Sequence, residues 1–275
     1  MWQLSAFADE IDPDLDRQLD VLAGEAISRL DLRAAWHTNV LDLGDDELTR
    51  VATALTAGGV RVATVASPIG KIPIGDDFDA HLVRFRRALA VADRLDCRVI
   101  RVFSFFIPPG DDPARHREAV LDRLGRLTRE AEAAGVTLLH ENEKEIYGDT
   151  PTRCHDLLAT LASPSLRAVW DPANFVQCGV RPFAEGYELL RPFVAAVHVK
   201  DARLGSGEVV PAGEGDGGWR ETIAALRASG FDGVFSLEPH LTAGGIFSGF
   251  TGPALFGTAA AAFKGLLREQ GIAWA

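Results

Sequence analysis

Eight short apolar runs alternate with longer amphipathic segments along this chain of 275 residues. The runs have the length and composition of buried strands, whereas the segments between them repeat apolar residues at helical spacing. The predicted strands are residues 3–7, 27–34, 61–66, 98–103, 136–139, 168–170, 194–197 and 234–237. Eight strands that alternate with eight helices predict an α/β fold, a single (β/α)8 TIM barrel formed by residues 1–275. A doubly wound sheet is the main alternative, but the chain shows no clear polar edge strand.

Turn and capping residues mark where the helices begin. Asp12-Pro13 is expected to begin the first helix, and Asp111-Asp112-Pro113 is expected to begin the longest one. A short helix is expected over residues 183–190. Two long loops that contain several glycines, residues 204–218 and 239–253, are expected to close over a bound substrate with the glycines as hinges.

Four consecutive predicted strands end in a residue that can bind a metal ion: Glu141, Asp171, His198 and Glu238. All strands of a barrel open at one mouth, so these side chains are expected to meet there, at the active site. Three carboxylates and one imidazole suit one divalent ion, with Mn²⁺, Zn²⁺, Mg²⁺ and Co²⁺ all compatible. The alternative is that acidic residues at strand ends only cap helices or bind loops. Four such residues in register on consecutive strands make this explanation weaker.

Three polar residues lie beside these predicted ligands. Asn142 follows Glu141 and is predicted to support a ligating carboxylate from behind. His140 faces the other side of its strand, so we expect a packed or hydrogen-bonded histidine that supports the site and is not a ligand. Asn174 lies three residues beyond Asp171, within reach of the metal or the substrate.

Lysine is rare in this sequence, and three of its four lysines follow predicted strands. Lys71, Lys144 and Lys200 are therefore predicted to bind the substrate as compact cations, although chance is the alternative in so small a sample. Asp31 and Arg33 alternate with leucines in the second strand. They form either a buried ion pair or a pair near the substrate, and the pattern leaves both interpretations open.

Composition narrows the class of partner. The formal net charge of −11 argues against a nucleic-acid partner, because binding to a duplex depends on basic side chains. No apolar run reaches the length of a membrane span, and the chain starts without a basic and apolar leader. Three cysteines match no zinc framework, so we expect reduced thiols and a cytoplasmic protein. The expected partner is a small-molecule carbohydrate, and a homo-oligomer is compatible with the sequence.

Five motifs resemble the sugar phosphate isomerase/epimerase superfamily of xylose isomerase-like TIM barrels. They are Glu141-Asn142, Asp171-Pro172-Ala173-Asn174, His198-Val199-Lys200-Asp201, Gly213-Glu214-Gly215-Asp216 and Ser236-Leu237-Glu238. The resemblance implies that Glu141, Asp171, His198 and Glu238 are the metal ligands and that the two glutamates are the acid/base pair. It also implies that Arg203, five residues past His198, and Glu214 bind the substrate.

Two positions depart from the ketose epimerases that this family contains. Asn174 stands where those enzymes usually have a histidine, and Tyr147 stands where some have a glutamate. The resemblance therefore favours the superfamily and its metal over ketose epimerisation in particular.

The predicted activity is a divalent-metal-dependent isomerase or epimerase that acts on a sugar, a sugar phosphate or a polyol derivative. The enzyme would abstract a proton next to a carbonyl through a metal-bound enediolate, with Glu141 and Glu238 as the catalytic pair. Two alternatives remain open: a dehydratase of the inosose or dehydroshikimate type, and a sugar-binding barrel without catalysis.

Overall fold

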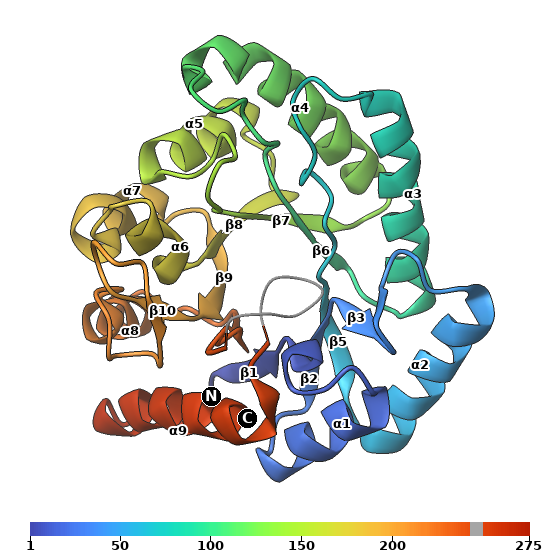
Figure 1. Ribbon diagram of the computed structural model, residues 1–275, viewed down its shortest axis with the longest axis vertical. Coiled ribbons are helices and arrows are strands. Elements are labelled where there is room, and N and C mark those ends of the chain that lie inside the picture. The colour runs from blue at the N-terminus through green and yellow to red at the C-terminus, as the bar shows by residue number, and fades with distance from the viewer. Residues whose placement is uncertain (243–249) are drawn as a thin grey trace.

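A ring of eight parallel strands forms the centre of the protein (Figure 1). The computed structural model describes residues 1–242 and 250–275. The strands run in the order β1-β12-β9-β8-β7-β6-β5-β2, and β1 and β2 lie side by side, which nearly closes the ring. The predicted (β/α)8 barrel is thereby confirmed. The strands are β1 (Gln3–Ala6), β2 (Arg29–Leu32), β5 (Arg61–Val65), β6 (Val99–Val102), β7 (Thr137–Glu141), β8 (Leu166–Trp170), β9 (Val194–Val199) and β12 (Val234–Leu237).

Amphipathic helices surround this ring and bury their apolar faces against it (Figure 1). In α3, for example, Leu82, Phe85 and Ala92 are buried at helical spacing. None of the helices in the described ranges combines the length and apolar character that a membrane span requires. The α-helices are α1 (Leu15–Gly24), α2 (Asp45–Gly58), α3 (Phe78–Arg94), α4 (Arg117–Ala133), α5 (Pro151–Leu161), α6 (Pro172–Gln177), α7 (Glu188–Leu190), α8 (Trp219–Ala228) and α9 (Gly252–Glu269).

Three helix predictions need correction. Asp14 caps α1 in place of Asp12, because its carboxylate accepts the backbone N–H groups of Asp16 and Arg17. The segment from Asp112 forms a separate 3-10 helix, η2 (Pro113–His116), before α4 begins, and α9 is longer than α4. The predicted helix at residues 183–190 is a π-helical turn, η3 (Phe183–Tyr187), which continues into the single turn α7.

One α-helix was not predicted at all. The short α6 starts directly at the tip of β8, where the Asp171 side chain accepts the Asn174 N–H at 2.9 Å. Asp171 is therefore both a predicted metal ligand and the cap of a helix. The sequence gives no helical signal here because the helix is too short to show an apolar period.

The barrel interior has an apolar layer beneath a charged layer. Leu139, Val169 and Ala196 form a small buried cluster, and Val99 packs against it. Because side chains alternate along a strand, the residue two positions further on faces the same interior and lies nearer the mouth. Those next residues are Arg101, Glu141, Asp171 and His198. Strand periodicity thus places one arginine in the same layer as the predicted ligands.

The loop after β9 is fixed by one buried carboxylate. It includes a small hairpin, β10 (Asp201–Ala202) and β11 (Val209–Val210). Oδ2 of Asp201 accepts the N–H groups of Gly213 and Gly215 at 2.9 and 3.0 Å. A Cβ atom at Gly215 would lie 2.4 Å from the Ala202 oxygen, so glycine here permits close approach. The other loop expected to close over the substrate ends where α9 begins, and its Gly244, Gly245 and Gly249 lie outside the described residues.

A tight turn after β5 positions Lys71 at the mouth. Gly70 adopts a positive φ of 90°, and a Cβ there would lie 2.0 Å from the Phe103 carbonyl oxygen. The Gly70 N–H donates to Nε2 of His81 at 2.8 Å, so that nitrogen is an unprotonated acceptor. Burial, together with the nearby Arg84 and Arg123, lowers the pKa of His81 to about 4.

This histidine predicts a loss of stability in mild acid. An unfolded histidine has a pKa of about 6.5, so as the pH falls from 6.5 towards 4 only the unfolded chain takes up the proton. His81→Gln removes the group that takes up this proton but keeps a side-chain oxygen that can accept the Gly70 N–H. We expect the variant's free energy of unfolding to fall less steeply over this window, by up to about 1.4 kcal/mol per pH unit. Urea unfolding at pH 7, 6 and 5 measures this, with the exposed His37→Gln as the control. If the free energy of unfolding changed equally with pH in wild type and His81→Gln, the low pKa of folded His81 would be contradicted.

Candidate functional site

Four side chains from consecutive strand tips meet at the mouth of the barrel. Glu141, Asp171, His198 and Glu238 are all buried, and each offers one ligand atom within 4.8 Å of the others. The Nδ1 atom of His198 lies 3.3 Å from Glu141 Oε1, 3.3 Å from Glu238 Oε2 and 4.0 Å from Asp171 Oδ2. The structure thus brings together the four residues that the strand pattern selected. Their binding of a metal ion stays a prediction.

The donor atoms of this cluster suit a divalent cation. Oε2 of Glu141, Oδ2 of Asp171 and Nδ1 of His198 are buried and make no hydrogen bond, although Arg101 and Lys200 lie at ion-pair distance from the two oxygens. A buried polar atom without a hydrogen bond is costly, by about 1–3 kcal/mol, and a coordinated ion would offset that cost. The ring of Phe7 packs edge-on against His198, with centroids 4.9 Å apart, and fixes the orientation of the imidazole. A set of oxygen and imidazole donors is compatible with Mn²⁺, Zn²⁺, Mg²⁺ and Co²⁺.

The electrostatics of the cluster favour a positive charge at its centre. Burial raises the pKa of Glu141, but His198 and Arg101 offset this and leave the pKa below its ordinary value. Burial acts the same way on Glu238, where Lys200 is the largest opposing influence and the pKa lies well below its ordinary value. Burial lowers the pKa of His198, but the two glutamates raise it to about 10. The carboxylates therefore attract either a proton on His198 or a metal ion.

Lys200, the residue directly after β9, reaches this cluster with its ammonium group. Nζ lies 2.9 Å from Asp171 Oδ2 and 3.4 Å from Glu238 Oε2, and the residue is only 3% exposed. Burial alone would lower its pKa, but Asp171 and Glu238 raise it above its ordinary value. Lys200 lines the cavity, as its predicted role requires, while its charge is already paired with two candidate ligands.

Two asparagines connect the tips of β7 and β8. Asn142 donates to the Asp171 carbonyl at 2.9 Å and accepts the Asp171 N–H at 3.2 Å, so it binds the backbone and not a carboxylate. Asn174 donates to Glu141 Oε1 at 3.3 Å and to the Asn142 carbonyl at 2.9 Å. The carboxylate support expected of Asn142 is thus given by Asn174. His140 is buried outside the cluster, where a Cβ on Gly148 would lie 2.5 Å from its ring.

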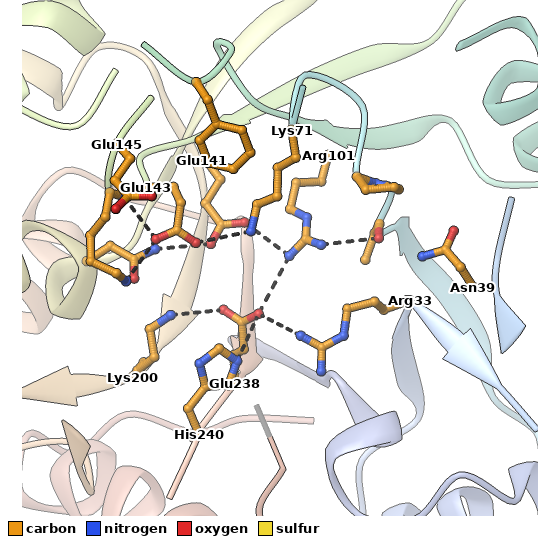
Figure 2. Close-up of a pocket in the computed structure, with 15 residues that line it drawn as sticks. Arg33, Asn39, Lys71, Arg101, Glu141, Glu143, Glu145, Lys200, Glu238 and His240 are labelled. Carbon is orange, nitrogen blue, oxygen red and sulfur yellow. Dashed lines mark hydrogen bonds and ion pairs between the residues drawn. The ribbon is translucent and has the colours of Figure 1, made fainter. Parts of the chain in front are cut away.

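A cavity of about 360 Å³ opens above the cluster (Figure 2). Its wall contains charged residues that the sequence interpretation did not assign to the site. Arg101 is one of them: Nη1 lies 3.1 Å from Glu141 Oε2 and 3.6 Å from Glu238 Oε1. An arginine inside an otherwise apolar barrel strand was the signal that could have identified it. The lining residues are Arg33, Asn39, Ala66, Pro68, Lys71, Arg101, Phe106, Glu141, Glu143, Lys144, Glu145, Asn174, Lys200, Glu238 and His240.

The structure separates Asp31 from Arg33. The Asp31 carboxylate accepts a hydrogen bond from the Ser5 hydroxyl, and Asp31 is absent from the described lining of the cavity. Arg33 turns towards the cavity, where Nε lies 2.7 Å from Asp9 Oδ2 and Nη1 lies 3.4 Å from Glu238 Oε1. The two residues therefore do not pair with each other, and only the arginine reaches the site.

A second cluster of polar side chains, centred on Glu10, joins the tip of β12 to the turn after β1. Glu10 Oε1 lies 3.0 Å from Nε2 of His240, and Oε2 accepts from the His240 N–H and the Thr251 hydroxyl at 2.9 and 2.7 Å. Glu10, Glu238 and His240 also fit the distances of a metal site. However, the guanidinium of Arg33 already lies 3.8 Å from Glu10 and 3.4 Å from Glu238. We therefore describe this group as an ion-pair clasp that holds residues 240 and 251 against the barrel.

The remaining predicted substrate-binding residues divide into two groups. Lys71 and Lys144 line the cavity, and both pair with Glu143, at 3.1 and 2.9 Å. Arg203 instead pairs with Glu208 at 3.0 Å on the exposed β10–β11 hairpin. Glu214 is exposed in the following loop. The described cavity lining includes neither Arg203 nor Glu214, so their role in substrate binding stays a prediction without structural support.

Fold and site together define a (β/α)8 barrel with a candidate metal centre at the carboxyl ends of its strands. The chain belongs to the xylose isomerase-like TIM barrel family, whose model matches residues 27–270. Among curated proteins, it is 34% identical over 99 residues to the 2-epi-5-epi-valiolone 7-phosphate 2-epimerase of Actinoplanes sp. strain SE50/110. That match covers 36% of this chain and 35% of the relative, so the similarity spans about a third of either protein.

Solved structures share the whole barrel at low identity. The IOLI protein, in a crystal structure with a bound zinc atom, has a TM-score of 0.79 at 15% identity over 97% of this chain and 98% of that chain. The probable 3-DHS dehydratase AsbF from Bacillus anthracis has a TM-score of 0.75 at 16% identity over 96% of this chain and 98% of that chain. At such identities the likeness establishes the fold alone.

The cluster predicts that metal affinity depends on Asp171. In Asp171→Asn the amide oxygen still caps α6, because asparagine is as good a cap as aspartate, but one anionic ligand is lost. We expect the affinity of metal-free protein for Mn²⁺ or Zn²⁺ to fall at least about tenfold, measured by calorimetric titration. Asp216→Asn, in the loop outside the cluster, is the control and should bind as wild type does. Equal affinity in wild type and Asp171→Asn would remove Asp171 from the ligand set.

Proposed function

We propose that this protein is a divalent-metal-dependent isomerase or epimerase that acts on a sugar or polyol derivative. The observation that carries the proposal is the position of two buried glutamates on either side of one point. Glu141 Oε1 and Glu238 Oε2 both lie 3.3 Å from His198 Nδ1. Family membership supports the proposal, as does the similarity in sequence to an epimerase over about a third of the chain.

Glu141, Asp171, His198 and Glu238 would hold the metal ion. When bound, the ion would polarise a substrate carbonyl and stabilise the negative charge that develops on its oxygen. The zinc atom of the IOLI protein supports zinc as one candidate.

In the proposed mechanism, Glu141 and Glu238 carry out the proton transfers. Glu141 stands at the tip of β7 and Glu238 at the tip of β12, so their carboxylates approach the centre from two directions. One carboxylate oxygen would take a proton from the carbon next to the carbonyl, and the other would return a proton. Return to the opposite face of the same carbon inverts that centre. Return to the neighbouring carbon exchanges an aldose for a ketose.

Neighbouring side chains hold both carboxylates in place for this task. Asn174 donates to Glu141 Oε1, while Arg101 lies 3.1 Å from Oε2 of the same residue. Arg33 lies 3.4 Å from Oε1 of Glu238, which leaves Oε2 facing His198. Asn174 thus orients Glu141, whose Oε2 faces the cation of Arg101. Arg33 orients Glu238, whose Oε2 faces the cluster.

The sequence similarity to an epimerase over 99 residues favours an epimerase over a dehydratase. The likeness to the probable dehydratase is one of fold at 16% identity, and a barrel fold does not determine a reaction. Product identity separates the two. The protein would be incubated with Mn²⁺ and with ketoses, inososes or dehydroshikimate. An epimerase or isomerase would give an isomer of the substrate, whereas a dehydratase would give a product that has lost water. Binding of a sugar without turnover would instead indicate a non-catalytic barrel.

The proposal predicts that Glu238 is required for proton exchange. Glu238→Gln keeps the size of the side chain but removes the base, so deuterium uptake from D₂O should fall by about 10²- to 10⁴-fold. Mass spectrometry of a substrate that wild type exchanges measures the effect, and circular dichroism verifies the fold. Glu145→Gln, at the cavity rim, is the matched control and should exchange normally. Undiminished exchange in Glu238→Gln would exclude Glu238 from the mechanism.

A further inference from the structure

The acids that line the cavity all come from one half of the chain, whereas its cations come from both halves (Figure 2). The described lining from the first half of the chain, up to Phe106, contains three cations and no acid. Those cations are Arg33, Lys71 and Arg101. The acids of the lining all come from the second half, together with the candidate metal centre: Glu141, Glu143, Glu145 and Glu238. We call the part of the lining formed by Arg33, Lys71 and Arg101 the cationic wall.

Arg101 differs from the other two cations in how its charge is compensated. Arg33 has its own carboxylate in Asp9 at 2.7 Å, and Lys71 has Glu143 at 3.1 Å. Among the described residues, the carboxylates within ion-pair distance of Arg101 belong to Glu141 and Glu238, which are both candidate metal ligands. Once those carboxylates share a divalent ion, the guanidinium has no anion of its own, although it is only 5% exposed. A buried charge without a counter-charge is expensive, so a further anion is expected beside it.

The surroundings of Arg101 hold it rigidly at the cavity. Nη2 donates to the Ala66 carbonyl at 3.2 Å, and the guanidinium carbon lies 5.0 Å from the ring centroids of both Phe7 and Phe103. The Nζ atom of Lys71 lies 4.3 Å from the centroid of Phe103. A guanidinium and an ammonium group therefore lie beside the same ring and line the same cavity. A fixed planar guanidinium matches the paired oxygens of a carboxylate or phosphate.

We propose that the cationic wall binds an oxyanion of the substrate, a carboxylate or a phosphate, with Arg101 as the main contact and Lys71 as the second. The substrate is thereby an acidic or phosphorylated derivative and not a neutral sugar. Arg101 lies within 3.6 Å of both proposed acid/base carboxylates, so the oxyanion is attached close to the carbon that exchanges its proton. This inference rests on the proposed function, because Arg101 lacks a counter-charge only when a metal ion occupies the cluster.

Calorimetric titrations with simple anions test the subsite apart from any turnover. Metal-free protein is first titrated with Mg²⁺ and Zn²⁺, and the loaded protein is then titrated with inorganic phosphate, glycolate or neutral ethylene glycol. We expect phosphate or glycolate to bind more tightly than ethylene glycol, and the tighter of the two identifies the oxyanion. Arg101→Met should weaken that binding about 10- to 100-fold. Metal affinity should be retained or improved in this variant, because a positive charge beside the cluster is removed.

Two further variants complete the experiment. Lys71→Met, on a partly exposed loop, should weaken the same anion to a smaller extent and covers the case in which Arg101→Met fails to fold. Arg84→Met removes an arginine that pairs with Asp42 away from the cavity, and it should bind the anion as wild type does. Equal binding of the anion by wild type, Arg101→Met and Lys71→Met would show that the metal ion alone holds it, which overturns the subsite. If metal-loaded protein bound phosphate and glycolate no more tightly than ethylene glycol, the subsite would also be overturned, while the metal centre would stand. Failure to bind either metal would instead overturn the proposed function, and the subsite with it.

Discussion

Three carboxylates that converge on one buried point are the constraint on which the rest of this structure depends. Two like charges 4 Å apart repel each other by about 4 kcal/mol at an effective dielectric constant of about 20. Glu141, Asp171 and Glu238 are all buried at such separations, so the barrel mouth is stable only if positive charge lies among them. Lys200 and Arg101 provide part of that charge from within the fold. A divalent ion would provide the rest.

This constraint explains why a barrel interior that is usually filled by apolar packing carries arginines here. The apolar layer of Leu139, Val169 and Ala196 supplies the packing, and the charged layer nearer the mouth supplies the site. Arg101 on β6 reaches Glu238 at the tip of β12 across the ring, and Arg33, which follows β2, reaches the same carboxylate with only β1 between the two strands. The ion pair between Arg101 and Glu238 thus joins opposite sides of the ring at the mouth.

The sequence carried enough information for the ring of strands and for the four side chains at its centre. The apolar runs alternate with helical segments, the last four runs are each followed by a possible metal ligand, and barrel strands open at a common mouth, so local pattern and one topological rule were sufficient. The same pattern could have placed Arg101 in the charged layer, but it could not have identified the residues that Arg101 contacts. A charge within an apolar run shows no local sign of its partner, and its contact with Glu238 exists only because β6 and β12 face each other across the closed ring.

Two expectations differ from what the structure shows, for similar physical reasons. The family resemblance implied that Arg203 binds the substrate, whereas the β10–β11 hairpin carries its side chain outward to Glu208. Position next to Glu141 suggested that Asn142 would hold the carboxylate, but successive side chains point in different directions, and Asn174 makes that contact from the first turn of α6. Both cases depend on direction in space, which sequence separation does not encode.

Glu238 shows how closely the fold and the proposed chemistry are linked. Its Oε2 faces His198 and Lys200, while its Oε1 faces Arg33 and Arg101. A base accepts a proton more readily as its pKa rises, and here the cations on either side outweigh burial and hold the pKa of Glu238 well below its ordinary value. An anion that binds Arg101 would draw part of its field away from Glu238 and strengthen Glu238 as a base. Substrate binding and proton abstraction would then be coupled through the guanidinium group of Arg101.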